Sequence, residues 1–432
     1  MTRKFILAVL VIFVAVTPLS AQVKIKAIKA GKLIDVVSGT VLTNQVILVE
    51  DNKITDVGPG IAIPSNAQVI DLSDATVLPG LIDCHTHMSH QPGKNYYERI
   101  FRETSIDIAV VAHMYAKRTL DAGFTMVRDL GAHDLIDVSL RNAINEGSIP
   151  GPRMLVACFA IGATGGHADL SGFNPEIDWK KNPDFTGVAD GVEQIRKRVR
   201  NNIKWGADCI KFMATAGVLS EDETVGGTQY TQEEMNAVVD ETHRWGKRVA
   251  VHAHGTDGIR KAIIAGVNSV EHGSLLDDEC IKLMKERGTY LVPTAYALES
   301  IVADSNYKIW PIKLVNKARS IAAQREVCFR KAFKSGIKIA YGTDAGVFPH
   351  GLNANDFRYF VAYGLSPMQA IQSATINAAD LLDWKEKTGS ITKGKLADII
   401  AVKENPINNI SLLEHVQFVM KDGVVYKNEF SK

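Results

Sequence analysis

The sequence predicts an α/β protein: a (β/α)8 TIM barrel with a small β-sandwich domain that is built from both chain ends. Between residues 77 and 385, short apolar runs alternate with helical patterns eight times, which is the repeat of a (β/α)8 barrel. At both ends of this region, short alternating segments separated by turn residues predict strands. No glycine-rich phosphate loop follows the first barrel strand, which argues against a dinucleotide-binding fold.

Residues 1–21 predict a signal peptide. Arg3 and Lys4 precede an apolar run, residues 5–16, that is too short to span a bilayer, and Ala21 offers a small residue for cleavage. A buried core helix is the alternative, but the position at the very start of the chain favours the signal. No cysteine follows Ala21 to carry a lipid, and no later segment reaches a spanning length without charge. We therefore expect an exported protein, periplasmic or secreted, with no stable membrane anchor.

Residues 22–76 and 386–432 predict the two parts of the β-sandwich. The first part shows apolar segments at 25–28, 33–35, 46–49 and 54–57. The second shows similar segments at 399–402, 416–420 and 424–426, with a turn at Lys421, Asp422 and Gly423. Neither part has enough strands to bury a core alone. Together they can form one domain.

Residues 77–385 predict the barrel. Its strands are expected at 77–85, 124–127, 154–157, 209–213, 249–251, 269–270, 290–292 and 337–340. Helices begin at Thr231, where Glu234 completes a capping box, and at Ser366, which precedes Pro367. Two long loops, 162–187 and 216–230, follow strands. They should therefore lie on the C-terminal face of the barrel, where active sites are built.

Composition excludes several functional classes. The 432-residue chain has a formal net charge of +1 and no block of Lys and Arg, so it is not a nucleic-acid binder. Its five cysteines are an odd number and show no motif spacing. Cys84, Cys158 and Cys209 lie in apolar runs, so we expect buried free thiols rather than a disulfide framework. A homo-oligomer is compatible with the sequence.

Polar residues at the strand ends point to a metal site. His85 and His87 are two apart on an extended chain, so both imidazoles can face one point. Alone, such a pair is more often two polar residues at a strand end. Here His252, His272 and Asp344 end other strands and should project toward the same mouth of the barrel. Imidazole and carboxylate donors suit zinc or a similar divalent ion.

Lys211 also lies at a strand end, where an ammonium group cannot bind a cation. Burial among imidazoles and metals would favour its neutral amine. A neutral amine can add carbon dioxide to form a carbamate that bridges two metals, and we prefer this over a lysine paired with an acid. Asp344 can bind a metal and shuttle a proton. Its alternative is a turn or helix-capping aspartate.

These pieces resemble the amidohydrolase superfamily over nearly the whole chain. The matching stretches are residues 79–87, 210–211, 251–255, 270–273, 342–344, 366–379 and 389–398. The resemblance implies two divalent ions, with His85 and His87 on the buried one and His252 and His272 on the exposed one. It also implies a carboxylated Lys211 between the ions, a metal-bridging hydroxide, and Asp344 as ligand and proton shuttle.

Within the superfamily, residues 125–131, 162–167 and 251–255 resemble the imidazolonepropionase-related group, which contains Xaa-Pro dipeptidases and related carboxypeptidases. The resemblance implies that His167 and Tyr230 bind the substrate's terminal carboxylate, with His254 as a further contact. The alternative for Tyr230 is a packing contact before the helix at Thr231. Arg128 could bind a carboxylate, but we favour a structural pairing with Asp129 or Asp134.

The predicted function is hydrolysis of the amide bond of a small-molecule substrate, a dipeptide or an N-acyl amino acid. The ligand set alone does not choose between an amide and a lactone, cyclic amide or ester, so those bonds are the alternative. A non-catalytic binding protein on a former hydrolase scaffold is a third reading. It is disfavoured because such scaffolds tend to lose ligands, and here all six expected ligands are present.

Overall fold

The computed structural model describes residues 25–94, 96–169, 174, 186–221, 224–304 and 309–430. The predicted signal peptide lies outside these residues, as do parts of both long loops. None of the helices in the described ranges combines the length and the apolar character that a membrane crossing requires. The four cysteines Cys84, Cys158, Cys209 and Cys280 are buried free thiols, which confirms the prediction for the first three.

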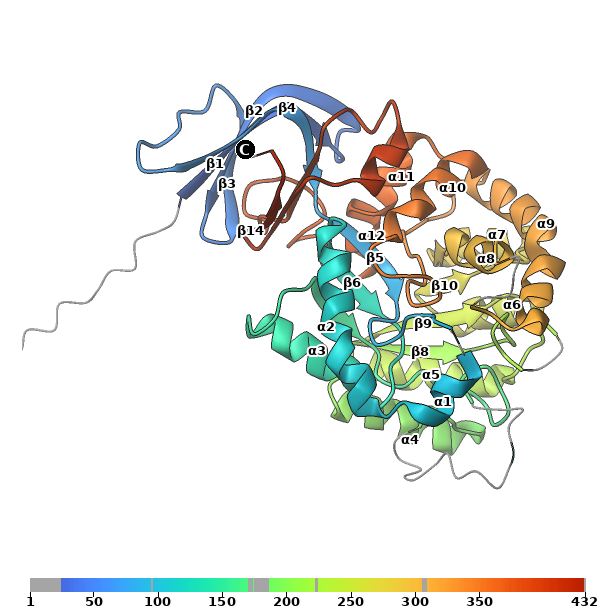
Figure 1. The fold of residues 1–432 in the computed structure, drawn as a ribbon. Helices are drawn as coiled ribbons and strands as arrows, with labels where there is room; N and C mark the ends of the chain where they lie inside the picture. The colour runs from blue at the N-terminus through green and yellow to red at the C-terminus, as the bar shows by residue number, and fades with distance from the viewer. Residues whose placement is uncertain are drawn as a thin grey trace, which may run out of the picture.

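Both chain ends contribute to one sheet, drawn in blue and dark red at the upper left of Figure 1. Its seven strands have the order β14-β13-β12-β4-β1-β2-β3. The strands are β1 (Ile25–Asp35), β2 (Thr40–Glu50), β3 (Lys53–Pro59), β4 (Gln68–Pro79), β12 (Ile399–Val402), β13 (Phe418–Lys421) and β14 (Val424–Asn428). The two ends meet where β4 pairs antiparallel with β12, with Pro79 opposite Ile399.

This sheet encloses its own apolar core. The β3 edge is hydrogen-bonded to the segment before β12, from Ile54 N to Lys395 O at 2.9 Å and from Ala397 N to Asn52 O at 2.9 Å. The enclosed cluster combines side chains from both ends, among them Ile28, Ile47 and Phe418, all 0% exposed. Both chain ends therefore contribute side chains to one apolar cluster.

The middle of the chain alternates parallel strands with helices, as predicted. Three strands form one sheet in the order β5-β6-β7, and four form another in the order β11-β10-β9-β8. They are β5 (Leu81–Thr86), β6 (Phe124–Asp129), β7 (Arg153–Val156), β8 (Cys209–Met213), β9 (Arg248–Ala253), β10 (Ser269–His272) and β11 (Tyr290–Val292). Isolated parallel bridges link these sheets to adjacent segments of the same chain. They join Ile161 to Phe212, Leu291 to Ile339, and Thr86 to Ala345.

The eighth predicted strand, residues 337–340, does not form a regular strand. Ile339 makes only an isolated parallel bridge with Leu291, although Ala340 N still donates to Leu291 O at 3.0 Å. From there the chain runs on beside β5, where Cys84 N donates to Tyr341 O at 2.8 Å. The turn that follows carries Asp344. The backbone is therefore already irregular in the segment that leads to this candidate ligand.

Helices lie outside the parallel strands in Figure 1. They are α1 (Tyr96–Arg102), α2 (Ser105–Asp121), α3 (Ile136–Asn145), α4 (Gly191–Lys204), α5 (Gln232–Arg244), α6 (Thr256–Ala265), α7 (Asp278–Arg287), α8 (Ala295–Val302), α9 (Ile312–Lys334), α10 (Asp356–Tyr363), α11 (Pro367–Ser373) and α12 (Ile376–Leu381). The predicted capping box of Thr231 and Glu234 is present at α5. Ser366 caps α11, with Pro367 in its first turn.

The sheet domain and the parallel strands are directly joined. Only Gly80 separates β4 from β5, and its N–H donates to Asp398 O at 2.9 Å. Arg153 of β7 reaches back to Asp398 at 2.7 Å and to Asp422 at 2.6 Å. These contacts fix the start of β5, and the first two candidate metal ligands lie at and just after its other end.

Candidate functional site

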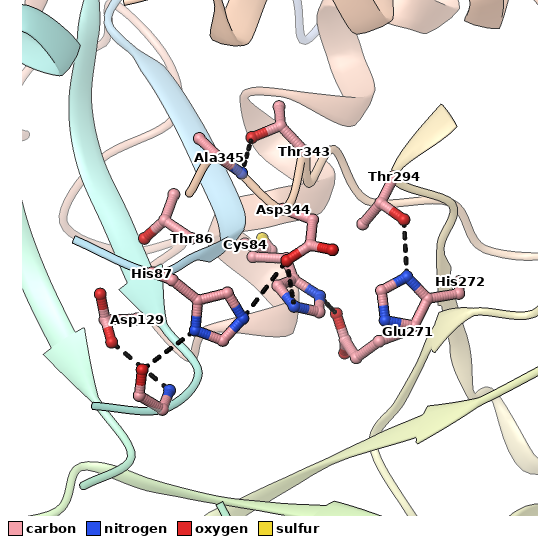
Figure 2. A network of polar contacts seen from close by, with 12 residues as sticks. Cys84, Thr86, His87, Asp129, Glu271, His272, Thr294, Thr343, Asp344 and Ala345 are labelled. Atoms are coloured by element: carbon pink, nitrogen blue, oxygen red, sulfur yellow. Dashed lines mark hydrogen bonds and ion pairs between the residues drawn. The ribbon is translucent and has the colours of Figure 1, made fainter. Parts of the chain in front are cut away.

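The first group of ligands lies at the end of β5. His85 lies in β5 and His87 directly follows its last residue, and the Nε2 atoms of both face Asp344 Oδ1, at 3.4 and 3.3 Å. Their other ring nitrogens have partners, because His85 Nδ1 donates to Glu271 Oε2 at 2.9 Å and His87 Nδ1 to Gly131 O at 3.0 Å. Figure 2 shows His87, Asp344 and Glu271 around this point. Ligand atoms of His85, His87 and Asp344 lie within 4.8 Å of one another.

A buried ion pair supports His85 from behind. Glu271 Oε1 accepts from Arg128 Nη2 at 2.9 Å, while Arg128 Nε donates to Cys84 O at 2.7 Å. Burial raises the pKa of Glu271, and the charge of Arg128 opposes that shift. Arg128 is fully buried in this network, and its carboxylate partner is Glu271 rather than Asp129 or Asp134 as predicted.

The second group of ligands comes from β9 and β10. Ligand atoms of His252, His254 and His272 lie within 4.8 Å of one another. Hydroxyl groups hold two of these rings, since His254 Nδ1 bonds Ser274 Oγ at 2.8 Å and His272 Nδ1 bonds Thr294 Oγ1 at 2.7 Å. The His272–Thr294 contact is drawn in Figure 2. The His85 and His272 ring centroids are 5.0 Å apart, so the two groups adjoin.

The protonation states suit metal binding. Burial lowers the pKa of His85, His252 and His272 well below the usual range. The charge of Lys211 adds to this effect at His85, and neighbouring histidines add to it at His252 and His272. The three rings are therefore neutral near pH 7, the form that binds a metal. Burial also opposes the charged form of His87, but its hydrogen bond to Asp344 and the charge of that carboxylate raise its pKa.

A buried ring nitrogen without a partner also indicates that the donor set fits a divalent cation. His252 Nε2 is buried and has no hydrogen-bond partner among the described atoms. A buried polar atom without a partner is costly, whereas a metal ion in front of it would remove that cost. His85 and His87, whose Nδ1 atoms are held, present their Nε2 atoms to Asp344, the arrangement in which histidines bind metals.

The backbone is strained at three residues of this site. His272, Thr294 and Asp344 have φ angles of 69°, 48° and 62°, in the left-handed region that side chains other than glycine rarely adopt. Thr294 is β-branched, so its conformation is the most unusual. Strain of this kind persists where the surroundings fix it, and it concentrates at functional sites.

Asp83 anchors the turn that carries Asp344. Its carboxylate accepts from Thr343 Oγ1 at 2.6 Å, from Asn353 Nδ2 at 2.8 Å and from His85 N at 3.1 Å. Burial raises the pKa of Asp83 to about 6, against the effect of these hydrogen bonds. One side chain thus ties the His85 strand to the Asp344 turn.

Lys211 lies on β8 and is 1% exposed. Burial lowers its pKa to about 8, although the carboxylates of Glu271 and Asp344 act in the opposite direction. The positive charge of Lys211 in turn helps to lower the pKa of His85 and His252. The structure therefore brings all six predicted ligands into one neighbourhood.

His167 joins the site from the first long loop. Its ring centroid lies 4.2 Å from that of His252, and its Nδ1 bonds Ser220 Oγ at 2.6 Å. A Cβ atom at Gly217 would lie 2.3 Å from the His167 ring, so only glycine fits there. His167 and His254 both line the pocket in front of the second group.

Tyr230 is placed differently from the prediction. It is 2% exposed within the main apolar cluster, and its hydroxyl donates to Ala189 O at 2.7 Å. The residues that line the pocket do not include it. Because the Tyr230 hydroxyl already donates to a backbone carbonyl, the geometry favours the packing interpretation over a contact with a substrate carboxylate.

Sequence reasoning assigned no role to Glu271, Asp83, Ser274 or Thr294. Two of them were visible as signals, because an acid inside a buried apolar strand needs a partner, and Asp83 and Glu271 both stand within such runs. The two hydroxyl residues follow strand ends in loops, and their roles depend on three-dimensional positions that spacing does not give.

Comparisons with known proteins agree with this geometry. The model of the amidohydrolase family matches residues 76–427. The chain is 33% identical to ochratoxinase from Aspergillus niger over 94% of its own length and 87% of that protein. It is 43% identical to a Xaa-Pro dipeptidase crystallised with methionine in its active site, with a TM-score of 0.89 over 94% of this chain and 100% of that one.

A prolidase crystallised with N-methylphosphonate-L-proline is 30% identical, with a TM-score of 0.86 and the same coverage of 94% and 100%. The resemblance inferred from the sequence motifs is thereby confirmed. The chain belongs to the amidohydrolase family, and it is a hydrolase that acts on carbon–nitrogen bonds.

Proposed function

We propose that this enzyme is a binuclear metal hydrolase that cleaves dipeptides or N-acyl amino acids, in the manner of a Xaa-Pro dipeptidase or a related carboxypeptidase. The observation that carries the proposal is the pair of adjoining ligand groups, His85–His87–Asp344 and His252–His254–His272. The relatives support the amide bond, because one is a Xaa-Pro dipeptidase and another is a prolidase that carries an L-proline derivative.

His85 and His87 would hold one metal and His252 and His272 the other, with Lys211 as a ligand that both share and Asp344 as a further ligand. The nitrogen-rich donor set favours zinc. A divalent ion in such a site makes hydroxide available near neutral pH and polarises the carbonyl of the substrate. The six protein groups fix the positions of the donors before the substrate arrives.

Asp344 is the residue that can move a proton in this site. Its Oδ1 atom faces His85 and His87, and its side chain is 13% exposed at the pocket. A carboxylate in this position can accept a proton from the attacking water and return it to the leaving amine nitrogen. The substrate must therefore place its scissile bond beside Asp344.

Lys211 is proposed to be a carbamate. The lowered pKa of about 8 leaves a larger neutral fraction near pH 7 than an ordinary lysine has. The neutral Nζ forms a bond to the carbon of carbon dioxide and releases one proton, which leaves an anionic group with two oxygen donors. Mass spectrometry of crystals or infrared spectroscopy with ¹³C-labelled carbon dioxide would detect it.

The decisive experiment is a panel of substrates with measured metal content. Protein loaded with zinc should carry close to two ions per chain and hydrolyse dipeptides or N-acyl amino acids. Loss of bound metal after His85→Ala or His252→Ala should abolish turnover. Turnover that survives complete metal removal would overturn the metal mechanism, and hydrolysis of lactones or esters but of no amide would assign the alternative reaction.

The architecture is proposed at finer detail as well. The two parallel sheets and the bridges at Ile161 and Ile339 support one (β/α)8 barrel over residues 77–385. The seven-stranded sheet with its enclosed core supports a β-sandwich made of residues 22–76 and 386–432, with its first part extended to Pro79 because β4 runs to that residue.

Export is proposed from the sequence of residues 1–21. Expressed in a Gram-negative host, the mature chain should begin near Gln22 and fractionate outside the cytoplasm. N-terminal sequencing of the mature protein checks this, and a start at Met1 or Thr2 would contradict it.

A further inference from the structure

The pocket in front of the second ligand group has two chemically different ends. The cavity volume is about 60 Å³, which is room for a few water-sized groups. One end is formed by imidazoles and by Asp344. The other end is aliphatic and is lined by Val218, Leu219, Ala297, Leu298, Ile301 and Val347. The reaction described above uses only the first end.

The aliphatic end is a firm part of the fold. Its residues come from three segments: the loop after β8, helix α8 after β11, and the turn after Asp344. Val218, Ala297, Leu298, Ile301 and Val347 are only 3% to 7% exposed. They belong to one apolar cluster, and behind them Trp310 and Leu314 of the α9 region are buried in the same cluster. The wall is therefore shaped before any ligand binds.

Two cations near this end, Arg325 and Lys317, act on His254, and Lys317 Nζ donates to Ser220 O at 2.8 Å. Arg325 lines the pocket, but its Nη2 forms an ion pair with Glu299 and its Nη1 donates to Ala295 O at 2.9 Å. The polar neighbours Ser274 and Thr294 are hydrogen-bonded to His254 and His272. Arg325 Nε has no partner among the described atoms, so an acidic group is the competing occupant. Glu299, which already pairs with Arg325, would repel such a group.

We propose that this aliphatic end is the subsite for a neutral, apolar side chain of the substrate, of leucine, methionine or phenylalanine size, adjacent to the scissile amide. The proposal rests on the proposed function and names its substrate class. Burial of such a side chain against aliphatic neighbours is favourable in proportion to the area removed from water. An acidic side chain would lose hydration there for a guanidinium that already pairs with Glu299, and a basic side chain would face the positive charge of Arg325.

The apolar side chain could belong to the acyl half or to the amine half of the substrate. Two series of compounds distinguish these sources: Xaa-Pro dipeptides, with Xaa on the acyl side, and N-acetyl-Xaa, with Xaa on the amine side. In each series Xaa is Gly, Ala, Leu, Met, Phe, Asp or Lys. In one series kcat/KM for Leu, Met or Phe should exceed that for Gly, Asp and Lys by at least about tenfold, the effect expected for methylene groups in an apolar pocket.

Two variants test the location of the subsite. Ala297→Leu adds bulk inside the pocket, so it should reduce kcat/KM for Leu, Met and Phe substrates by about tenfold or more while sparing Gly and Ala substrates. The control Ala303→Leu makes the same change at an exposed position just past α8, and it should leave the preference unchanged. An unaltered preference in Ala297→Leu would overturn the proposal.

Binding to the zinc-loaded enzyme gives a readout that needs no turnover. Calorimetry should show L-methionine and L-leucine binding at least about tenfold more tightly than L-aspartate and L-lysine, and Ala297→Leu should remove that difference. Equal or tighter binding of L-aspartate would overturn the subsite and assign Arg325 to an acidic group. Selective L-methionine binding without hydrolysis of any amide would leave the subsite standing and reject the proposed function.

Discussion

The two ligand groups are similar in composition but differ in what holds them. In the first group, the carboxylate of Glu271 holds His85, and Arg128 in turn pairs with Glu271. In the second group, the hydroxyls of Ser274 and Thr294 hold His254 and His272. Hydrogen bonds to a charged group are about twice as strong as those between neutral groups. The first group should therefore hold its ligands more rigidly.

The difference teaches how one pocket can combine a permanent metal position with an adaptable one. A carboxylate behind a histidine raises the basicity of the ring and fixes its orientation, which strengthens metal binding. A hydroxyl orients the ring without adding charge. The second group also borders the pocket, where the substrate enters. We expect the first group to retain metal and the second to exchange it.

The largest expected effect is at Asp344, which belongs to the first ligand group and carries the proposed proton transfer. Asp344→Asn keeps the shape of the side chain but removes its charge and its capacity to accept a proton. We expect kcat/KM to fall by roughly 10²–10⁴. Steady-state kinetics on a dipeptide measures this. The control His113→Ala changes an exposed residue of α2 and should have no effect; a similar loss there would point to general destabilisation.

Two single substitutions, one behind each ligand group, test the difference between the groups directly. Glu271→Gln leaves Arg128 buried without a charged partner, so the free energy of unfolding should fall by about 3–5 kcal/mol. Metal affinity at the first group should fall by about 10–100-fold. Thr294→Val removes a neutral hydrogen bond and should cost only about 0.5–1.5 kcal/mol of unfolding free energy. Denaturant unfolding and metal titration measure both, and equal losses would remove the distinction between the groups.

Metal release should occur in two steps. Under increasing chelator concentration, the second group should lose its ion first, at a concentration roughly tenfold lower, because neutral partners support its histidines. Elemental analysis after dialysis counts the ions that remain. In His252→Ala the early step should disappear while the late step persists. Release of both ions in one step, in the wild type, would contradict the comparison.

The smallest expected effect lies outside both groups. Tyr230→Phe removes the hydrogen bond to Ala189 O, so the free energy of unfolding should fall by about 0.5–1.5 kcal/mol. The ratio of kcat/KM for an Xaa-Pro dipeptide to that for its C-terminal amide should stay at the wild-type value. A selective loss on the free carboxylate would restore the substrate-binding role predicted from the sequence.

Much of the site follows from periodicity. A strand places alternate residues on one side, and the carboxyl ends of parallel strands lie at the same end of a barrel. The sequence could therefore predict that His85, His87, His252 and His272 lie together. Periodicity says little where the backbone is irregular. Residues 337–340 read as a strand, yet the chain there forms only a bridge and then the strained turn at Asp344.

Partners that depend on distant segments were also beyond the sequence. The Glu271–Arg128 pair joins residues 143 positions apart, and Asp83 reaches Asn353 across 270 positions. No local pattern specifies such pairs. Tyr230 shows the opposite problem, because both of its readings were compatible with its place before α5, and only the contact with Ala189 separates them.

The pairing of β4 with β12 has a consequence for biosynthesis. A nascent chain leaves the ribosome from its N-terminus, so β1 to β4 emerge long before β12 to β14 can join them. Until then β4 presents one unpaired edge, and the apolar face that Phe418 will cover stays open. Unpaired edges of this kind favour aggregation. Factors that keep the emerging chain extended should therefore raise the yield of this protein more than that of a relative whose sheet is continuous in sequence.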